Sequence, residues 1–122
     1  MTTQATVSES GSDDEGLPLF FKHYRKRGFS LSMETLDTFP DRQAREPDFF
    51  NALKKCGSYL NEFYRVKDAL LNHGLVAYKL DENYDKVIYL TDLGTEILER
   101  TAELDELMRQ GREAEEKRRA NL

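Results

Sequence analysis

Apolar positions in the first structured part of the chain follow a helical spacing. They are Leu17, Phe20, Phe21 and Tyr24. This spacing predicts a helix that Gly28 ends, since glycine is common just past the last helical residue. Residues 29–31 then favour a short strand, and Ser32 has the position of a cap for a brief helix over residues 33–39. A polar connection over residues 41–46 follows.

Two further helices flank a glycine turn. Pro47 suits the start of the first of them, and Gly57 closes it. Its buried face is expected to consist of Phe49, Phe50, Leu53 and Cys56. The second helix runs to about His73, where Gly74 provides a left-handed stop. Its apolar stripe repeats at i, i+3 and i+7 and consists of Phe63, Val66 and Leu70.

Two alternating stretches after the helix that ends near His73 indicate a β-hairpin. Residues 75–80 and 86–90 alternate in hydrophobicity, and the polar residues 81–85 form the turn between them. Thr91 is a natural N-cap for a last, long helix. That helix carries an apolar stripe in its first half, and past Gly111 nearly every residue is charged. The predicted fold is therefore mainly α with a small β-hairpin, an α+β chain that ends in a long helix.

Charge is distributed unevenly along the chain, whose formal net charge is −5. Residues 1–16 carry four acidic residues and no basic one. With almost nothing to bury, they are expected to form a disordered acidic tail. Residues 42–79 carry seven basic residues against four acidic ones, whereas residues 80–122 carry seven against twelve. We expect one domain over residues 17–92 and a C-terminal helix over residues 93–122 that frays at its end.

Composition excludes several classes of protein. The chain has 122 residues and 39% hydrophobic content, enough for one modest core. It holds a single cysteine and no apolar run near the roughly 18 residues of a membrane span. Neither a metal-ligand spacing nor a nucleophile with an acid/base partner stands out. We expect a soluble cytoplasmic protein that is not an enzyme, with no cofactor, metal or membrane partner.

The stretch from Phe63 to Val76 resembles the recognition helix of MarR-type and PadR-type winged-helix regulators. It shares their register of apolar residue, Arg, Asp, Leu and a closing Gly-Leu-Val. The stretch from Leu90 to Leu98 likewise resembles the Leu-Thr-x-x-Gly segment that follows their wing. This resemblance covers roughly residues 50–100 and implies a winged helix-turn-helix with a long C-terminal helix. Two features depart from it: the segment between residues 29 and 47 is long, and the wing is acidic where the family usually carries arginine.

The resemblance implies a surface that contacts double-stranded DNA, with the helix that ends near His73 in the major groove. Arg65 is the leading candidate for a guanine edge or a phosphate, and the lysines would contact the backbone. The alternative is that these side chains form only the solvated face of an amphipathic helix. The candidate DNA-binding residues are Lys54, Lys55, Ser58, Tyr59, Asn61, Glu62, Tyr64, Arg65, Lys67, Asp68, Lys79 and Lys86.

The apolar stripe of the last helix should pack against another surface, and a second copy of the chain is the simplest such surface. The predicted dimerisation residues are Leu93, Ile97, Leu104, Leu107 and Met108. The alternative is that the stripe folds back on its own domain. The leading hypothesis is a sequence-specific, dimeric transcriptional regulator whose effector is unknown. The second is a winged-helix module for protein–protein interaction in a larger complex, with the acidic wing and tail docking a basic partner.

Overall fold

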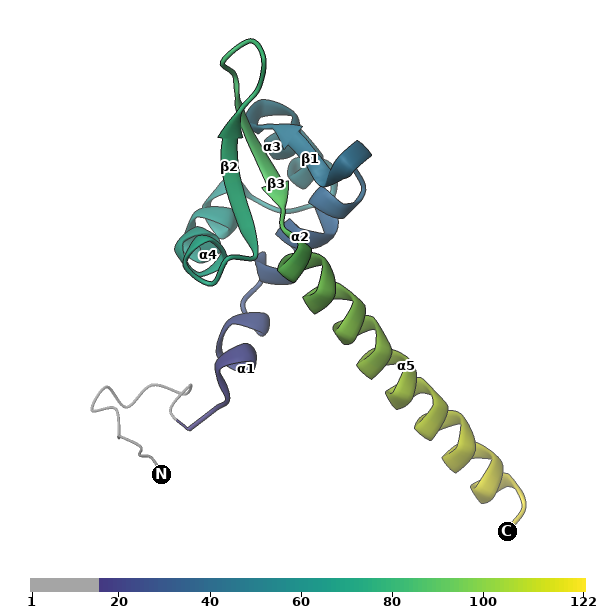
Figure 1. The fold of residues 1–122 in the computed structure, drawn as a ribbon. Helices are drawn as coiled ribbons and strands as arrows, with labels where there is room; N and C mark the ends of the chain where they lie inside the picture. Colours follow the sequence, from purple (N-terminus) through teal and green to yellow (C-terminus); the bar gives the residue numbers. More distant parts are fainter. Residues whose placement is uncertain (1–15) are drawn as a thin grey trace.

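The computed structural model describes residues 16–122 and consists mostly of helices with one small antiparallel sheet, which confirms the α+β class (Figure 1). The predicted tail, residues 1–16, lies outside the described residues except for Gly16. In chain order the elements are α1 (Leu19–Tyr24), α2 (Phe29–Asp37), a 3₁₀ turn (Pro40–Arg42), β1 (Gln43–Arg45), α3 (Glu46–Lys55), α4 (Leu60–Asn72), β2 (Val76–Leu80), β3 (Lys86–Leu90) and α5 (Asp92–Ala120).

The sheet has three strands in the order β1-β3-β2 (Figure 1). The predicted hairpin is confirmed, because β2 pairs with β3 in a register that places Tyr78 opposite Ile88. On the other side of β3, Ala44 of β1 also lies opposite Ile88. The polar connection predicted over residues 41–46 is therefore wrong, since it contains a strand. Only Ala44 of that strand is buried, so its three residues carry no alternation that a sequence could reveal.

The helix α2 occupies the centre of the molecule, where the sequence predicts a strand over residues 29–31. It contacts α3, α4, α5, β1 and β3. It begins directly after Gly28, whose φ of +98° is left-handed and whose α-carbon faces the backbone of Glu62. Ser32 is a buried residue inside this helix and not its cap. The preceding helix α1 correspondingly ends at Tyr24 and not at Gly28.

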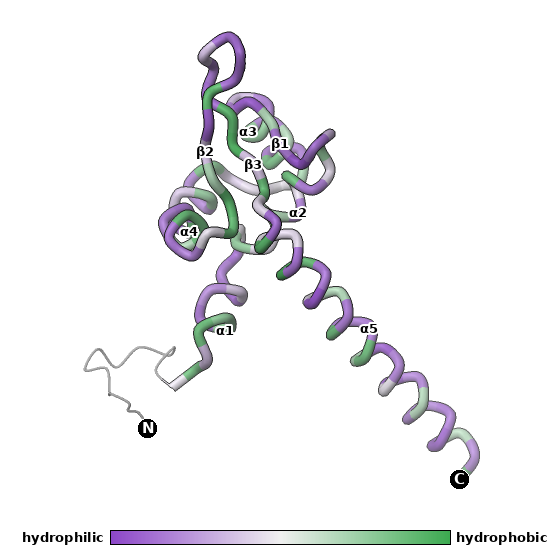
Figure 2. The backbone as a smooth tube through the Cα atoms, viewed as in Figure 1, coloured by the Kyte–Doolittle hydropathy of each residue, from purple (hydrophilic) through white to green (hydrophobic). Residues whose placement is uncertain are grey.

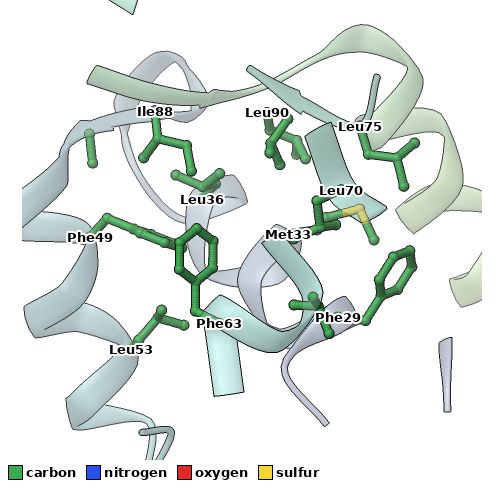
Figure 3. Close-up of a cluster of buried hydrophobic side chains, with 13 residues drawn as sticks. Phe29, Met33, Leu36, Phe49, Leu53, Phe63, Leu70, Leu75, Ile88 and Leu90 are labelled. Carbon is green, nitrogen blue, oxygen red and sulfur yellow. The ribbon is translucent and has the colours of Figure 1, made fainter. Parts of the chain in front are cut away.

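The core lies between the sheet and the helices α2, α3 and α4 (Figure 3). The rings of Phe49 and Phe63 meet edge to face with centroids 5.2 Å apart, joining α3 to α4. Met33 and Leu36 of α2 are fully buried beside them. The buried stripe predicted for α4 is confirmed, but Cys56 is exposed, because α3 ends one residue before it.

The Leu-Thr-x-x-Gly segment joins the hairpin to α5. Thr91 caps the helix as predicted, since its hydroxyl oxygen accepts a hydrogen bond from the amide of Gly94 at 3.0 Å. The same hydroxyl donates to the carbonyl of Gly74 at 2.6 Å. Gly94 is buried, and a methyl group on it would lie 2.6 Å from Leu90 Cδ1 and still closer to the carbonyl of Leu75. The segment therefore fixes where α5 leaves the sheet.

The helix α5 projects away from the rest of the molecule (Figure 1). Its 29 residues give a length of about 43 Å. Ile97 and Leu98 pack against the core, but beyond Thr101 every residue except the half-buried Glu115 is exposed. Hydrophobic residues interrupt a largely polar surface along its first half (Figure 2).

Candidate nucleic-acid interface

The helix α4 has one buried and one solvent-facing side. Phe63, Val66 and Leu70 face the core. The opposite side exposes polar groups at the spacing of one helical face, and these are Asn61, Tyr64, Arg65 and Asp68. Four of the predicted DNA-binding residues therefore share a single surface.

A carboxylate inside the first turn holds the start of α4. Glu62 Oε1 accepts hydrogen bonds from the backbone amide of Tyr59 at 3.0 Å and from the hydroxyl of Ser58 at 2.9 Å. Its other oxygen lies 2.7 Å from Nε of Arg27. The amide of Tyr59, with help from the Ser58 hydroxyl and the Arg27 charge, holds the pKa of Glu62 below its usual value. Ser58 itself is buried. These two predicted contact residues thus have their polar atoms engaged within the fold.

The loop between α1 and α2 lies against the start of α4, and the region where Lys26, Arg27 and Arg65 meet is called the corner of α4 below. Arg27 also donates from Nη2 to the carbonyl of Gly57 at 2.9 Å, so it spans the turn between α3 and α4. Together Lys26, Arg27 and Arg65 line a hollow of about 430 Å³. All three side chains are exposed. The basic run before Gly28 is visible in the sequence, but only the fold shows that it meets α4.

The other predicted lysines lie at two different places. Lys54 and Lys55 are exposed in the last turn of α3, which the turn over residues 56–59 joins to the start of α4. Lys67 lies beside Tyr64 at the edge of the exposed face of α4, with Nζ 5.6 Å from the ring centroid of Tyr64 and 5.6 Å from that of Tyr78. Lys54 and Lys55 therefore lie in the segment that leads into α4, and Lys67 lies between Tyr64 and Tyr78 of the hairpin.

The half of the hairpin nearer its turn forms a compact aromatic and ionic cluster with the start of α3. The Tyr78 hydroxyl donates to Glu46 Oε2 at 3.0 Å, and Lys86 Nζ lies 3.6 Å from the same oxygen. Lys86 Nζ also lies 4.3 Å from the centroid of the Tyr78 ring. Burial, and then the bond to Glu46, raises the pKa of the Tyr78 phenol. Lys79 lies over the ring of Tyr89, 5.2 Å from its centroid. Lys86 is thus matched by a carboxylate.

The tip of the hairpin is acidic. Asp81 Oδ1 accepts from the amides of Asn83 at 2.8 Å and Asp85 at 2.9 Å, which closes the turn. Asp85 lies 3.4 Å from Arg45 of β1, an arginine that also faces Asp48. Tyr84 at the tip is 82% exposed. The tip therefore presents carboxylates and an aromatic ring, whereas the corner of α4 presents cations.

The structure divides the five predicted dimerisation residues into two groups. Ile97 packs against the core of its own domain, in line with the alternative of a stripe that folds back. Leu93, Leu104, Leu107 and Met108 are all about half exposed or more, with Met108 at 76%. Leu104, Leu107 and Met108 lie on the projecting part of α5, which gives that part an uncovered apolar surface.

Residues 16–122 hold no group of three His, Cys, Asp or Glu side chains that gather as a metal site would require. None of the helices in this part of the chain combines the length and the apolar character needed to cross a membrane. No protein-family model, curated protein or solved structure matches the chain.

Proposed function

We propose that this chain is a sequence-specific regulator of transcription that binds double-stranded DNA as a homodimer. In this proposal the chain is a winged helix-turn-helix protein, and α4 enters the major groove with its exposed face. Tyr64, Asn61 and Arg65 then face the base edges and the phosphates.

The order of the elements supports the winged-helix assignment. The chain runs through α2, β1, α3, α4 and then the hairpin β2–β3. The short strand β1 adds to the hairpin on the side of β3. A helix pair joined by a tight turn and followed directly by a hairpin is the arrangement that gives this class its name.

The cationic corner of α4 carries the proposal. Arg65 of α4 and Lys26 and Arg27 from a segment about 40 residues earlier line one hollow. The solvated face of an ordinary amphipathic helix needs no such convergence from a second segment. Lys26 and Arg65, with Arg27 already paired to Glu62 beside them, fit a phosphate backbone, because phosphate contacts position a protein on DNA.

The acidic hairpin tip limits how DNA can approach. Asp81, Glu82 and Asp85 would repel phosphates, so the proposal keeps the tip away from the duplex. Contact then comes from α4, the loop before α2 and the end of α3. This differs from a wing that reaches into the minor groove.

Binding to random duplex DNA across a salt series tests the proposal. The wild type should bind at low salt and weaken steeply as salt rises. Arg65→Ala, and separately the pair Lys54→Ala and Lys55→Ala, should weaken binding and flatten the salt slope by about one for each phosphate that is no longer neutralised. Arg100→Ala, at an exposed position on α5, is the matched control and should bind like the wild type. Absence of binding at low salt by a protein that circular dichroism shows to be folded would refute the proposal.

One observation favours a second candidate, an interaction module within a larger complex. The hairpin tip exposes Tyr84 at 82% and Leu80 at 62% among acidic residues. Apolar side chains within a ring of carboxylates fit a basic protein partner. The two candidates separate in the same experiment, because the interaction module predicts that the folded chain has no affinity for DNA at low salt.

A further inference from the structure

A groove opens where α1, α2 and the first half of α5 meet. Its volume is about 780 Å³. Phe20, Phe21 and Tyr24 form the wall on α1, and Leu98, Leu104 and Met108 lie on α5. In Figure 1 the helices α1 and α5 diverge from the domain on either side of this region.

The α1 wall of the groove is a small aromatic cluster. Phe20 stacks on Tyr24 with ring centroids 4.8 Å apart, and the edge of Phe21 meets Phe20 at 5.4 Å. Phe21 is 49% exposed, and Met108 on the opposite side is 76% exposed. Apolar surface of this kind gains free energy when another surface covers it.

The charged side chains that line the groove are all acidic. They are Glu34 and Asp37 of α2 and Asp105 of α5. An occupant that suits this groove therefore combines small or apolar side chains with positive charge. Asp105 is paired with Arg109 of the same helix, but neutral apolar cover would bury Glu34 and Asp37 without a counter-charge.

The last part of α5 has that composition. Ala114 and Ala120 supply small side chains, and Lys117, Arg118 and Arg119 supply consecutive cations. Within one copy both Arg118 and Arg119 reach the same carboxylate, Glu115, so positive charge remains in excess at this end. Residues 92–108 hold six acidic residues and one basic one, whereas residues 109–122 hold five basic and three acidic ones.

We propose that the groove holds the C-terminal part of α5 from a second copy, with the two α5 helices antiparallel. The partner's basic end then lies beside the acidic first half, and a two-fold axis near Met108 makes the two contacts identical. A parallel pair would instead place the two acidic halves side by side. This interface deepens the proposed homodimer and rests on that part of the proposed function, but not on the DNA contact.

The antiparallel orientation gives a sharp cross-linking test. With Cys56→Ser as background, Thr101→Cys and Glu115→Cys stand at equal distances on either side of Met108 and only about 40° apart around the helix, so both can face the partner. A mixture of these two variants should form disulfide-linked dimers under mild oxidation, and each variant alone should form few. Efficient cross-linking of each variant with itself would indicate a parallel pair and overturn the proposal, as would a chain that is monomeric by sedimentation at concentrations of tens of micromolar.

Charge reversal tests the acidic groove independently. Replacing the basic end, with Lys117→Glu, Arg118→Glu and Arg119→Glu, should raise the dimer dissociation constant by about tenfold or more at low salt. Adding Glu34→Lys and Asp37→Lys to the same chain should restore the dimer. Failure of the restored chain to dimerise, while it remains folded, would contradict the groove as the docking site. Lys54→Glu with Lys55→Glu is the control: it should impair DNA binding and leave the dimer intact, so that the two proposals can fail separately.

Discussion

The carboxylate of Glu62 has the chemistry of a DNA contact but stabilises the fold instead. Glu62 is a suitable acceptor for a cytosine amine, and its sequence position puts it on the helix that is proposed to face DNA. In the structure it receives the Tyr59 amide, the Ser58 hydroxyl and the Arg27 guanidinium. It joins the start of α4 to the loop before α2. Its position at the third residue of a helix is the signal for this role.

Replacing this carboxylate should change the pH dependence of stability. The pKa of Glu62 is lower in the folded chain than in the unfolded one, so its contribution is complete above the unfolded value of about 4.3 and disappears as the pH falls through the folded value. Glu62→Gln should therefore be less stable than the wild type near neutral pH, and the gap in unfolding free energy should narrow at a pH below the unfolded pKa of Glu62. Urea unfolding at the two pH values measures this. A gap that is the same at both would show that the charge contributes nothing.

Gly94 is the residue whose identity the packing restricts most clearly. A methyl group there meets Leu90 Cδ1 at 2.6 Å and the carbonyl of Leu75, a backbone atom that cannot move aside. Gly94→Ala should therefore lower the free energy of unfolding by about 1–3 kcal/mol, the usual range for overpacking. Gly111→Ala is the matched control on the same helix, since it meets nothing within 4 Å and should stabilise by about 0.5–1 kcal/mol. Thermal or urea unfolding of both variants gives the comparison, and equal effects would contradict it.

At the scale of elements, the sequence predicts those with a clear period and misplaces those without one. Phe63, Val66 and Leu70 form one buried stripe over two turns of α4. Hydrophobic and polar residues alternate in β2 and β3 on both sides of a polar turn. The strand β1 is only three residues long, and β3 alone pairs with it. The pattern of α2 resembles a strand and a brief helix, because Phe29 and Leu31 alternate and Ser32 resembles a cap. Burial on most sides explains that error, because α2 contacts several other elements and leaves only Glu34 and Asp37 exposed.

The candidate interface is predictable only where it follows one helix. Asn61, Tyr64, Arg65 and Asp68 follow from the period of α4. The approach of Lys26 and Arg27 depends on Gly28, whose left-handed backbone turns the chain against the first turn of α4. No local pattern encodes a contact between segments that lie so far apart in the sequence.

Lys26 tests whether the loop before α2 belongs to the interface. Its side chain lines the hollow with Arg65, so Lys26→Ala should weaken DNA binding several-fold and lower the salt slope by about one. Lys26 suits this test better than Arg27, because Arg27 also binds Glu62 and Gly57. Lys117→Ala, on the remote end of α5, should leave monomer affinity for a half-site unchanged. An unaltered salt slope in Lys26→Ala would restrict the interface to α3 and α4.

The whole molecule separates charge and apolar surface along its length. Cations gather at the corner of α4, carboxylates at the hairpin tip, and uncovered apolar residues on the first half of α5. The projecting part of α5 is held within one chain by ion pairs such as Arg109–Asp105 and Arg112–Glu116. Each such pair contributes only about 0.2–0.5 kcal/mol, and most helical stability in proteins comes from the packing of an apolar face. The proposed partner would supply the packing that these ion pairs do not give to a helix that extends to Ala120.

Interrupting α5 without touching the core tests this view of the whole molecule. Gly111→Pro costs a helix interior about 3 kcal/mol, and nothing within 4 Å of the position packs against it. The domain should keep its cooperative unfolding, because the buried core ends at Leu90 and its last packed neighbour is Leu98. We expect the variant to sediment as a monomer, to lose helical circular dichroism, and to bind a DNA half-site while losing the tighter binding of a paired site. A Gly111→Pro variant that remains dimeric would show that the two copies meet elsewhere, since an α5 broken at this point cannot carry its basic end into the partner's groove.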